Sequence, residues 1–147
     1  MNKYRQFSFF SVVVVVALIG MVLQASGQEK AKSETAPKET IPFTIVRLVV
    51  GTGIEDREPV GVAESFPAST ERVSCFLEAA DIVNDIEVSF VWYNGQSELL
   101  KFNLPLQKGP RWRTSAFKNL YGQKGDWKVE IRDAEGKLLK DVKFKVE

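Results

Sequence analysis

The chain is 147 residues long, which is room for one folded domain. A hydrophobic fraction of 44% and a charged fraction of 27% are ordinary for a globular protein, and a formal net charge of +1 argues against an electrostatic nucleic-acid binder. The sequence contains no histidine, which excludes Ser-His-Asp and Cys-His catalysis and removes the commonest zinc ligand. P-loop, GxSxG and Cys-x-x-Cys motifs are also missing, and no spacing singles out a catalytic pair of carboxylates. We therefore expect a protein that is not an enzyme and needs no cofactor.

Residues 1–27 have the composition of a targeting segment. Lys3 and Arg5 precede an apolar run over residues 7–23, and the small residues Ala25-Ser26-Gly27 follow it. This order is typical of a secretory signal peptide. The alternative is an uncleaved helical anchor, which would touch the membrane only through residues 7–23. Either reading predicts export to the periplasm or the extracellular space.

Residues 28–42 are predicted to be a disordered polar linker, because Ile41 is their only large apolar residue. We expect the folded domain to span residues 43–147. Cys75 is the only cysteine, so an intrachain disulfide is excluded. It lies in an apolar run, which predicts a buried, unreactive thiol rather than a reactive one.

The clearest local pattern lies between Gly125 and Glu147. Trp127, Val129 and Ile131 alternate with charged residues, and so do Val142, Phe144 and Val146. Alternation with a period of two predicts strands that are buried on one face. The polar run 133–136 between them suits a hairpin loop.

Further β-rich stretches precede this hairpin at residues 43–50, 72–79, 86–93, 100–104 and 111–117. Asn94-Gly95 predicts a hairpin turn, Pro105 is expected to end its strand, and residues 54–68 are predicted to be a loop, at most with a short irregular strand. About seven strands at regular spacing, with no amphipathic helix, favour an all-β fold. We predict an antiparallel β-sandwich of immunoglobulin-like type.

Four motifs together resemble a known bacterial family. They are Thr52–Gly61 (TGIEDREPVG), Val91-Trp92-Tyr93, Arg111–Ser115 (RWRTS) and Gly125–Glu130 (GDWKVE). In order and spacing they are similar to domain-of-unknown-function family 2914, over roughly residues 45–147. No activity is attached to that family, so the resemblance implies domain boundaries and leaves the function open.

The chain departs from the family pattern at one point. A histidine often precedes the Trp-Tyr pair in the family, whereas Ser89 and Phe90 occupy that neighbourhood here. Any role that the histidine has in the family is missing from this chain.

Arg111 and Arg113 are the strongest candidates for binding-site residues. On a strand they share one face with Ser115, while Trp112 and Thr114 share the other. Two guanidinium groups on one face can bind a carboxylate or phosphate. The alternative is structural: the guanidiniums would stack on Trp92 or Tyr93 and pair with nearby acids.

The acidic cluster of Glu55, Asp56 and Glu58 has two interpretations. Three carboxylates can hold Ca²⁺, but Arg57 stands among them and opposes a cation. A solvated turn with Arg57 paired elsewhere is the favoured reading, so we predict no metal site.

The tryptophans and Tyr93 divide into two groups. Trp92 and Trp127 fall on the apolar phase of their strands and are predicted to be core residues, whereas Tyr93 and Trp112 adjoin polar positions. We therefore predict a binding surface around Arg111, Arg113, Tyr93, Trp112 and Arg57. Its expected ligand is a protein partner in the cell envelope. The alternative is a glycan or peptidoglycan bound by exposed aromatic side chains.

Overall fold

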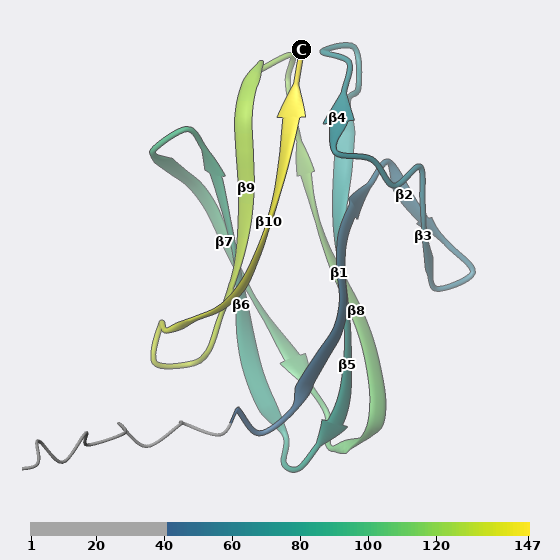
Figure 1. Cartoon of the computed structure of the whole chain (residues 1–147), viewed down its shortest axis with the longest axis vertical. Coiled ribbons are helices and arrows are strands. Elements are labelled where there is room, and N and C mark those ends of the chain that lie inside the picture. The colour runs from purple at the N-terminus through teal and green to yellow at the C-terminus, as the bar shows by residue number, and fades with distance from the viewer. Residues whose placement is uncertain (1–40) are drawn as a thin grey trace, which may run out of the picture. The chain divides into compact units, whose positions relative to one another are not determined.

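The structure of the chain is a computed structural model that describes residues 41–147 (Figure 1). The expectations for the targeting segment and for most of the linker fall outside the described residues. Within 41–147 every regular element is a β-strand, and no helix is long and apolar enough to cross a membrane. The all-β prediction is confirmed for this part of the chain.

Seven strands have eight or more residues in the described part of the chain. They are β1 (Thr44–Gly51), β5 (Arg72–Ile82), β6 (Ile86–Asn94), β7 (Ser97–Leu106), β8 (Gly109–Asn119), β9 (Gly125–Arg132) and β10 (Leu138–Val146). Three shorter strands lie between β1 and β5: β2 (Gly53–Glu55), β3 (Glu58–Val60) and β4 (Ser65–Phe66). The long strands match the β-rich stretches of the sequence.

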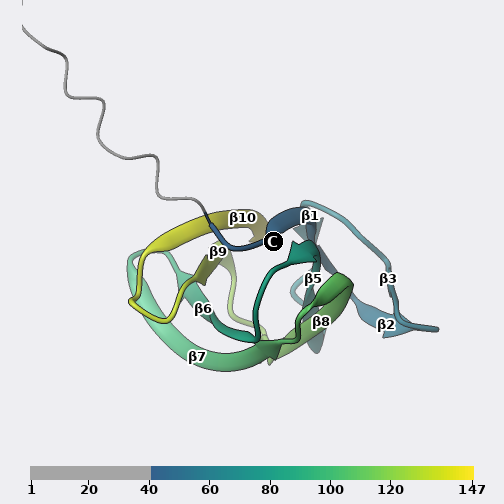
Figure 2. The same ribbon diagram turned by 90° about the horizontal axis from the view of Figure 1, so that it is seen from below.

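The long strands form two sheets. One has the order β1-β5-β8, and the other has the order β4-β10-β9-β6-β7. Seen from below in Figure 2, the two sheets lie as layers that face each other across the interior. All neighbours pair antiparallel except β4, which joins β10 in parallel. β2 and β3 form a separate hairpin beside the three-stranded sheet (Figure 1).

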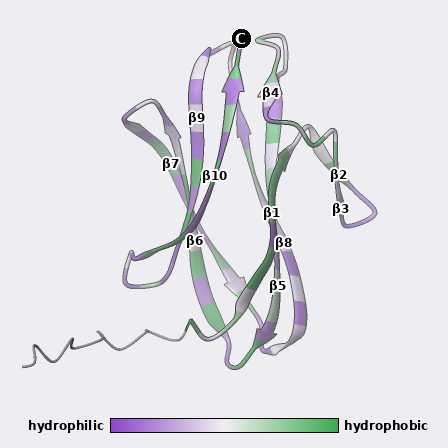
Figure 3. Cartoon of the chain, in the orientation of Figure 1, coloured by the Kyte–Doolittle hydropathy of each residue, from purple (hydrophilic) through white to green (hydrophobic). Residues whose placement is uncertain are grey.

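Side chains along each strand alternate between the two faces of the sheet, and the inward-facing apolar ones fill the space between the layers. In β5, Val73, Cys75 and Leu77 point inward and are fully buried. Hydrophobic and hydrophilic bands follow one another along the strands in Figure 3. Such a pattern is expected where one face of a sheet is packed and the other is polar.

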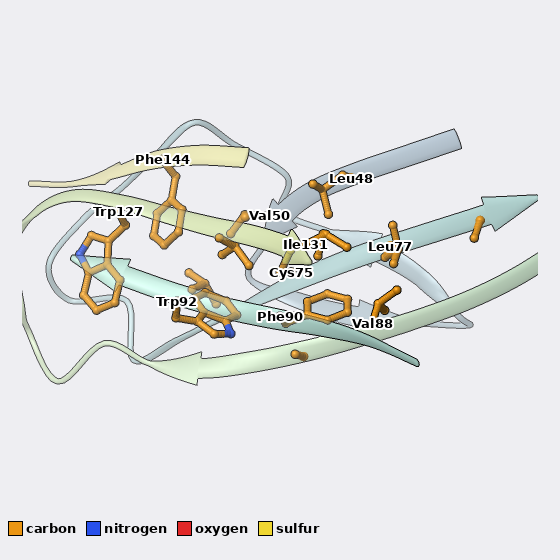
Figure 4. Close-up of a cluster of buried hydrophobic side chains, with 14 of the residues drawn as sticks. Leu48, Val50, Cys75, Leu77, Val88, Phe90, Trp92, Trp127, Ile131 and Phe144 are labelled. Carbon is orange, nitrogen blue, oxygen red and sulfur yellow. The ribbon is translucent and has the colours of Figure 1, made fainter. Parts of the chain in front are cut away.

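The two largest fully buried side chains of the core, Trp92 and Trp127, come from the five-stranded sheet. Trp92 and Trp127 are at most 1% exposed, and the Trp127 ring stacks on Phe144 at 5.9 Å between ring centroids (Figure 4). The predicted burial of Trp92, Trp127 and Cys75 is therefore confirmed. Burial also raises the pKa of the Cys75 thiol far above its ordinary value, which keeps it protonated and unreactive.

The prediction for residues 54–68 is corrected by the β2–β3 hairpin. Glu55 pairs with Glu58 across a two-residue turn in which Asp56 and Arg57 have φ angles of 48° and 64°. Two residues with positive φ are typical of a type I′ turn, which usually contains Asn or Gly. The sequence pattern did not reveal the hairpin because an arginine such as Arg57 rarely adopts that conformation.

The prediction that Pro105 ends its strand is also wrong. β7 continues to Leu106, and Pro105 lies opposite Glu87 of β6. Proline is tolerated there because β7 is an edge strand of its sheet, so the missing N–H removes no bond to a second neighbour. The hairpin predicted at Asn94-Gly95 is present, with Asn94 paired to Ser97.

Candidate functional site

A row of charged residues crosses the outer face of the three-stranded sheet. Glu78 in the central strand β5 lies opposite Arg47 of β1 on one side and Arg113 of β8 on the other. The three positions belong to the outward phase of their strands, as predicted for Arg113. Register therefore places one carboxylate between two guanidinium groups.

Glu78 is buried although it faces outward. Its side chain is 3% exposed, and it is surrounded by three arginines. Arg47 Nη2 donates a hydrogen bond of 2.9 Å to Oε2, Arg111 Nε pairs with Oε1, and Arg113 Nε lies 3.7 Å from that same oxygen. A buried carboxylate needs such partners, because an unpaired one would cost several kcal/mol.

The β2–β3 hairpin supplies a second carboxylate. Glu58 lies 2.6 Å from Arg47 Nη2 and 2.8 Å from Arg113 Nη1. Its two oxygens thus join the arginines of β1 and β8 above the central strand. Arg47 also lies over the Phe76 ring, 4.8 Å from its centroid. We call the five charged residues Arg47, Glu58, Glu78, Arg111 and Arg113 the arginine cluster.

The pKa of Glu78 reflects two opposed effects. Burial alone would raise it, but the hydrogen bond from Arg47 and the charges of Arg111 and Arg113 outweigh burial and hold the pKa below its ordinary value. The pKa of Arg47 is raised, chiefly by its hydrogen bond to Glu58. Glu78 and Arg47 therefore both stay charged near neutral pH.

The arginine cluster carries one more positive than negative charge. Its three guanidiniums face two carboxylates, and the Arg111 side chain is 59% exposed. Arg111 uses Nε for Glu78, and no interaction within the described residues engages its two terminal nitrogens. Those nitrogens form a planar donor pair suited to a carboxylate or phosphate from another molecule.

The structure separates the predicted site residues. Arg111 and Arg113 lie together, whereas Tyr93 lies on β6 in the other sheet, where Lys128 Nζ is 4.7 Å from its ring centroid. The Trp112 side chain lies on the opposite face of β8 from Arg111 and Arg113 and packs against the core. Stacking of the two arginines on Trp92 or Tyr93 is not what the structure contains, because their partners are carboxylates.

Arg57 occupies the exposed tip of the β2–β3 hairpin. No ion pair of Arg57 occurs among the described residues, so the predicted pairing with a distant acid is not seen there. Within 41–147 no three His, Cys, Asp or Glu residues gather closely enough to hold a metal ion. Of the acidic cluster in this loop, only Glu58 belongs to the arginine cluster.

A second buried glutamate lies on the outer face of the other sheet, and sequence reasoning missed both. Glu130 of β9 lies 2.6 Å from Lys128 Nζ and accepts a 2.8 Å hydrogen bond from Arg132 Nε. Burial would raise its pKa, but these two cations lower it below the ordinary value. For Glu130 the available clue was an acid flanked by Lys128 and Arg132 on the polar phase of its strand, whereas no basic residue flanks Glu78 in the sequence.

A mostly apolar cavity of about 630 Å³ lies at the end of the layers opposite the C-terminus. It is bounded by the start of β1, the start of β6 and the β9–β10 hairpin. Its apolar lining includes Phe43, Ile86, Val88 and Leu139, and its rim carries Asp85, Glu87, Asp133, Glu135 and Lys137. Sequence reasoning did not find it, because three distant segments form it.

A family model described as "Protein of unknown function (DUF2914)" matches residues 85–146. The resemblance to the DUF2914 family is confirmed over these residues. The matched range holds three of the four motifs, including Arg111 and Arg113. The Thr52–Gly61 motif precedes the range, so the DUF2914 match begins at β6 and leaves out β1 and the β2–β3 hairpin.

Several solved structures resemble the chain that contains this DUF2914 region. One is the C-terminal domain of wzt, with 9% identity, a TM-score of 0.49, and coverage of 72% of this chain and 74% of that one. A β-glucosidase from Listeria innocua in complex with laminaribiose has 8% identity, a TM-score of 0.45, and coverage of 71% and 16%.

A β-glucosidase from Kluyveromyces marxianus has 11% identity, a TM-score of 0.43, and coverage of 71% and 14%. This chain thus spans about a sixth of the length of the glucosidases. No curated protein matches the sequence.

Proposed function

We propose that the chain is a non-catalytic binding module of the cell envelope that docks an acidic protein partner on the arginine cluster. The observation that carries the proposal is the exposed Arg111 side chain in a cluster with more guanidiniums than carboxylates. Export is inferred from the order of charged, apolar and small residues in 1–27. The absence of histidine and of catalytic motifs supports a binding role.

The strand order supports the immunoglobulin-like assignment. In constant-type immunoglobulin domains the first, second and fifth strands share one sheet, and the third, sixth and seventh share the other. Numbered by the seven long strands, the first, second and fifth (β1, β5 and β8) share a sheet here, and the third, sixth and seventh (β6, β9 and β10) share the other. The fourth strand differs, because constant-type domains place it in the first of these sheets, whereas β7 pairs with β6 in the second. A rigid sandwich of this kind is a frequent platform for recognition.

Glu78 and Glu58 prepare the arginines for binding. Hydrogen bonds and ion pairs to buried or half-buried carboxylates hold the guanidiniums in place before a partner arrives. Less side-chain freedom is then lost on binding, which favours affinity. A carboxylate of the partner would meet the terminal nitrogens of Arg111, beside the positive charge of Arg113.

Glycan binding through Trp112 is less favoured as an alternative. Trp112 is half-buried and packs against the core, so its ring is not a free platform. Any glycan site must use other aromatic side chains.

The test compares partner capture by the full-length wild type and an Arg111→Gln variant after crosslinking in intact cells. Glutamine removes the charge but leaves most of the stem, and the Glu78 carboxylate keeps Arg47 and Arg113. Lys101→Gln, an exposed change on β7 in the other sheet, is the matched control. We expect one protein to be captured by the wild type and the control and lost with Arg111→Gln. Equal capture by all three would place the site elsewhere.

A further inference from the structure

Tyr121 is the most exposed large apolar or aromatic side chain among the described residues. It is 78% exposed and lies in the loop between β8 and β9, at the same end as the C-terminus. Phe117, near the end of β8, is 49% exposed and precedes Tyr121 by four residues in the chain. Neither belongs to the arginine cluster or to the hydrophobic core.

The backbone at Tyr121 is unfavourable for a tyrosine. Its φ angle is 52°, and that of Gly122 is 71°, in a turn closed by a 2.9 Å hydrogen bond from Gln123 N to Leu120 O. Asn or Gly adopts this conformation more readily than a residue with a large side chain. A strained position that holds an exposed ring gives little to folding, so packing does not explain why tyrosine is there.

Neighbouring side chains hold the ring in place. Asn119 Nδ2 donates a 3.4 Å hydrogen bond to the Tyr121 hydroxyl, and Lys118 Nζ lies 5.3 Å from the ring centroid. Asn119 is itself held by a 3.0 Å hydrogen bond from Arg72 Nε to its Oδ1. The ring is therefore oriented in advance, which reduces the entropy lost when a ligand stacks on it.

A shallow cavity of about 390 Å³ adjoins the ring. Besides Tyr121 it is lined by Ser69, Thr70, Glu71, Arg72 and Asn119. These residues offer hydroxyl, carboxylate, guanidinium and amide groups, so donors and acceptors surround one aromatic face. An apolar peptide would offer no partner to the hydroxyls of Ser69 and Thr70 or to the Glu71 carboxylate, and Glu71 opposes an anionic ligand.

We propose that Tyr121 and this polar cavity bind a hexose unit of a glycan. The apolar C–H face of the sugar ring would stack on Tyr121, while its hydroxyls would bond to Asn119, Arg72 and Glu71. A sugar has an apolar face and many hydroxyls, which matches a site with one aromatic surface among donors and acceptors. The site lies at the end of the layers and is separate from Arg111.

The first experiment screens the full-length chain on an array of hexose and N-acetylhexosamine oligosaccharides and against purified peptidoglycan. The best glycan is then titrated into ¹⁵N-labelled protein. We expect amide shift changes concentrated in residues 68–72 and 117–122. The absence of any bound glycan, or shift changes confined to other residues, would overturn the proposal.

Three variants connect binding to the ring. Tyr121→Asn removes the ring but suits the left-handed turn, so we expect affinity to fall about tenfold or more without a lower melting temperature. Tyr121→Phe keeps the ring and should bind within a few-fold of wild type. Unchanged affinity in Tyr121→Asn would refute a stacking role. Arg111→Gln should bind the glycan as wild type does, which separates this proposal from the arginine cluster.

Discussion

At the scale of single residues, two buried glutamates are the least expected feature of the protein. Glu78 and Glu130 lie on the outer faces of different sheets, and each is kept charged by basic neighbours on its own or adjacent strands. Both have pKa values below the ordinary carboxyl value in spite of burial. Their charges therefore contribute to stability only where both they and their partners are ionised.

Glu78→Gln tests this contribution through its pH dependence. Because the pKa of Glu78 is lower in the folded than in the unfolded chain, its stabilising effect is present above the ordinary value of 4.5 and is lost as the pH falls through the folded pKa. Wild type should lose stability on acidification below about pH 4.5, and the variant should show a shallower loss. Urea unfolding over a pH series measures this. Parallel pH profiles would contradict it.

Arg113→Ala and Arg111→Ala are expected to differ in stability. Arg113 is 27% exposed and pairs with both glutamates of the cluster, whereas Arg111 is 59% exposed. Removal of Arg113 should cost about 1–3 kcal/mol, because it leaves charges underpaired, and removal of Arg111 at most about 1 kcal/mol. Thermal unfolding of both variants gives the comparison. A larger loss of stability in Arg111→Ala than in Arg113→Ala would show that Arg111, not Arg113, is the more important arginine for stability.

At the scale of elements, the β2–β3 hairpin is attached to the sheet in two ways. Gly51 permits close approach, since a Cβ there would collide with the Val60 carbonyl, and Thr52 N donates a 2.9 Å hydrogen bond to Val60 O. The ion pairs of Glu58 fasten the other end of the hairpin over β1 and β8. Few apolar contacts hold it, so these polar contacts decide its local stability.

Glu58→Gln should loosen the hairpin without unfolding the protein. Its side chain is 42% exposed, so the loss in global stability should stay within about 1 kcal/mol. Amide hydrogen exchange should become faster in residues 53–60 and remain unchanged in β9. Glu55→Gln, an exposed neighbour on the same hairpin, is the matched control. Equal exchange in both variants would show that the ion pairs do not hold the hairpin.

At the scale of the whole molecule, one core joins the two sheets. Cys75 and Leu77 from β5 belong to the same buried cluster as Trp92 and Trp127 from β6 and β9. Neither layer can bury its apolar face without the other, because an isolated sheet leaves that face in water. The described part of the chain should therefore unfold as one cooperative unit.

Two probes on opposite sheets test this cooperativity. In a Trp112→Phe background, tryptophan fluorescence reports on Trp92 and Trp127 alone, and pulsed alkylation of Cys75 reports on β5. Both should give the same urea midpoint, with no labelling of the native thiol. Separate midpoints would mean that the two sheets unfold independently.

Trp127→Ala should remove a large part of the stability of the whole domain. The ring is 1% exposed, stacks on Phe144, and donates a 3.2 Å hydrogen bond to Gln123 O. The expected cost is about 3–5 kcal/mol, enough to unfold a small domain. Urea unfolding against wild type measures it, and a near-wild-type midpoint would contradict a core role.

The sequence by itself determined the local structure of this protein. β-rich composition and period-two alternation located the long strands. Alternation also gave the burial of Trp92 and Trp127 and the shared face of Arg111 and Arg113, because side-chain direction along a strand depends only on neighbouring positions. Hairpin turns indicated that β6 pairs with β7 and β9 with β10, but only the tertiary structure decided the other strand neighbours. Contacts between distant segments produce three features of the protein. Glu78 pairs with Arg47 and Arg113, Glu58 of the β2–β3 hairpin pairs with the same two arginines, and a cavity forms beside Tyr121. Periodicity in one strand carries no information about its partner, so these sites become visible only when the sheets are assembled.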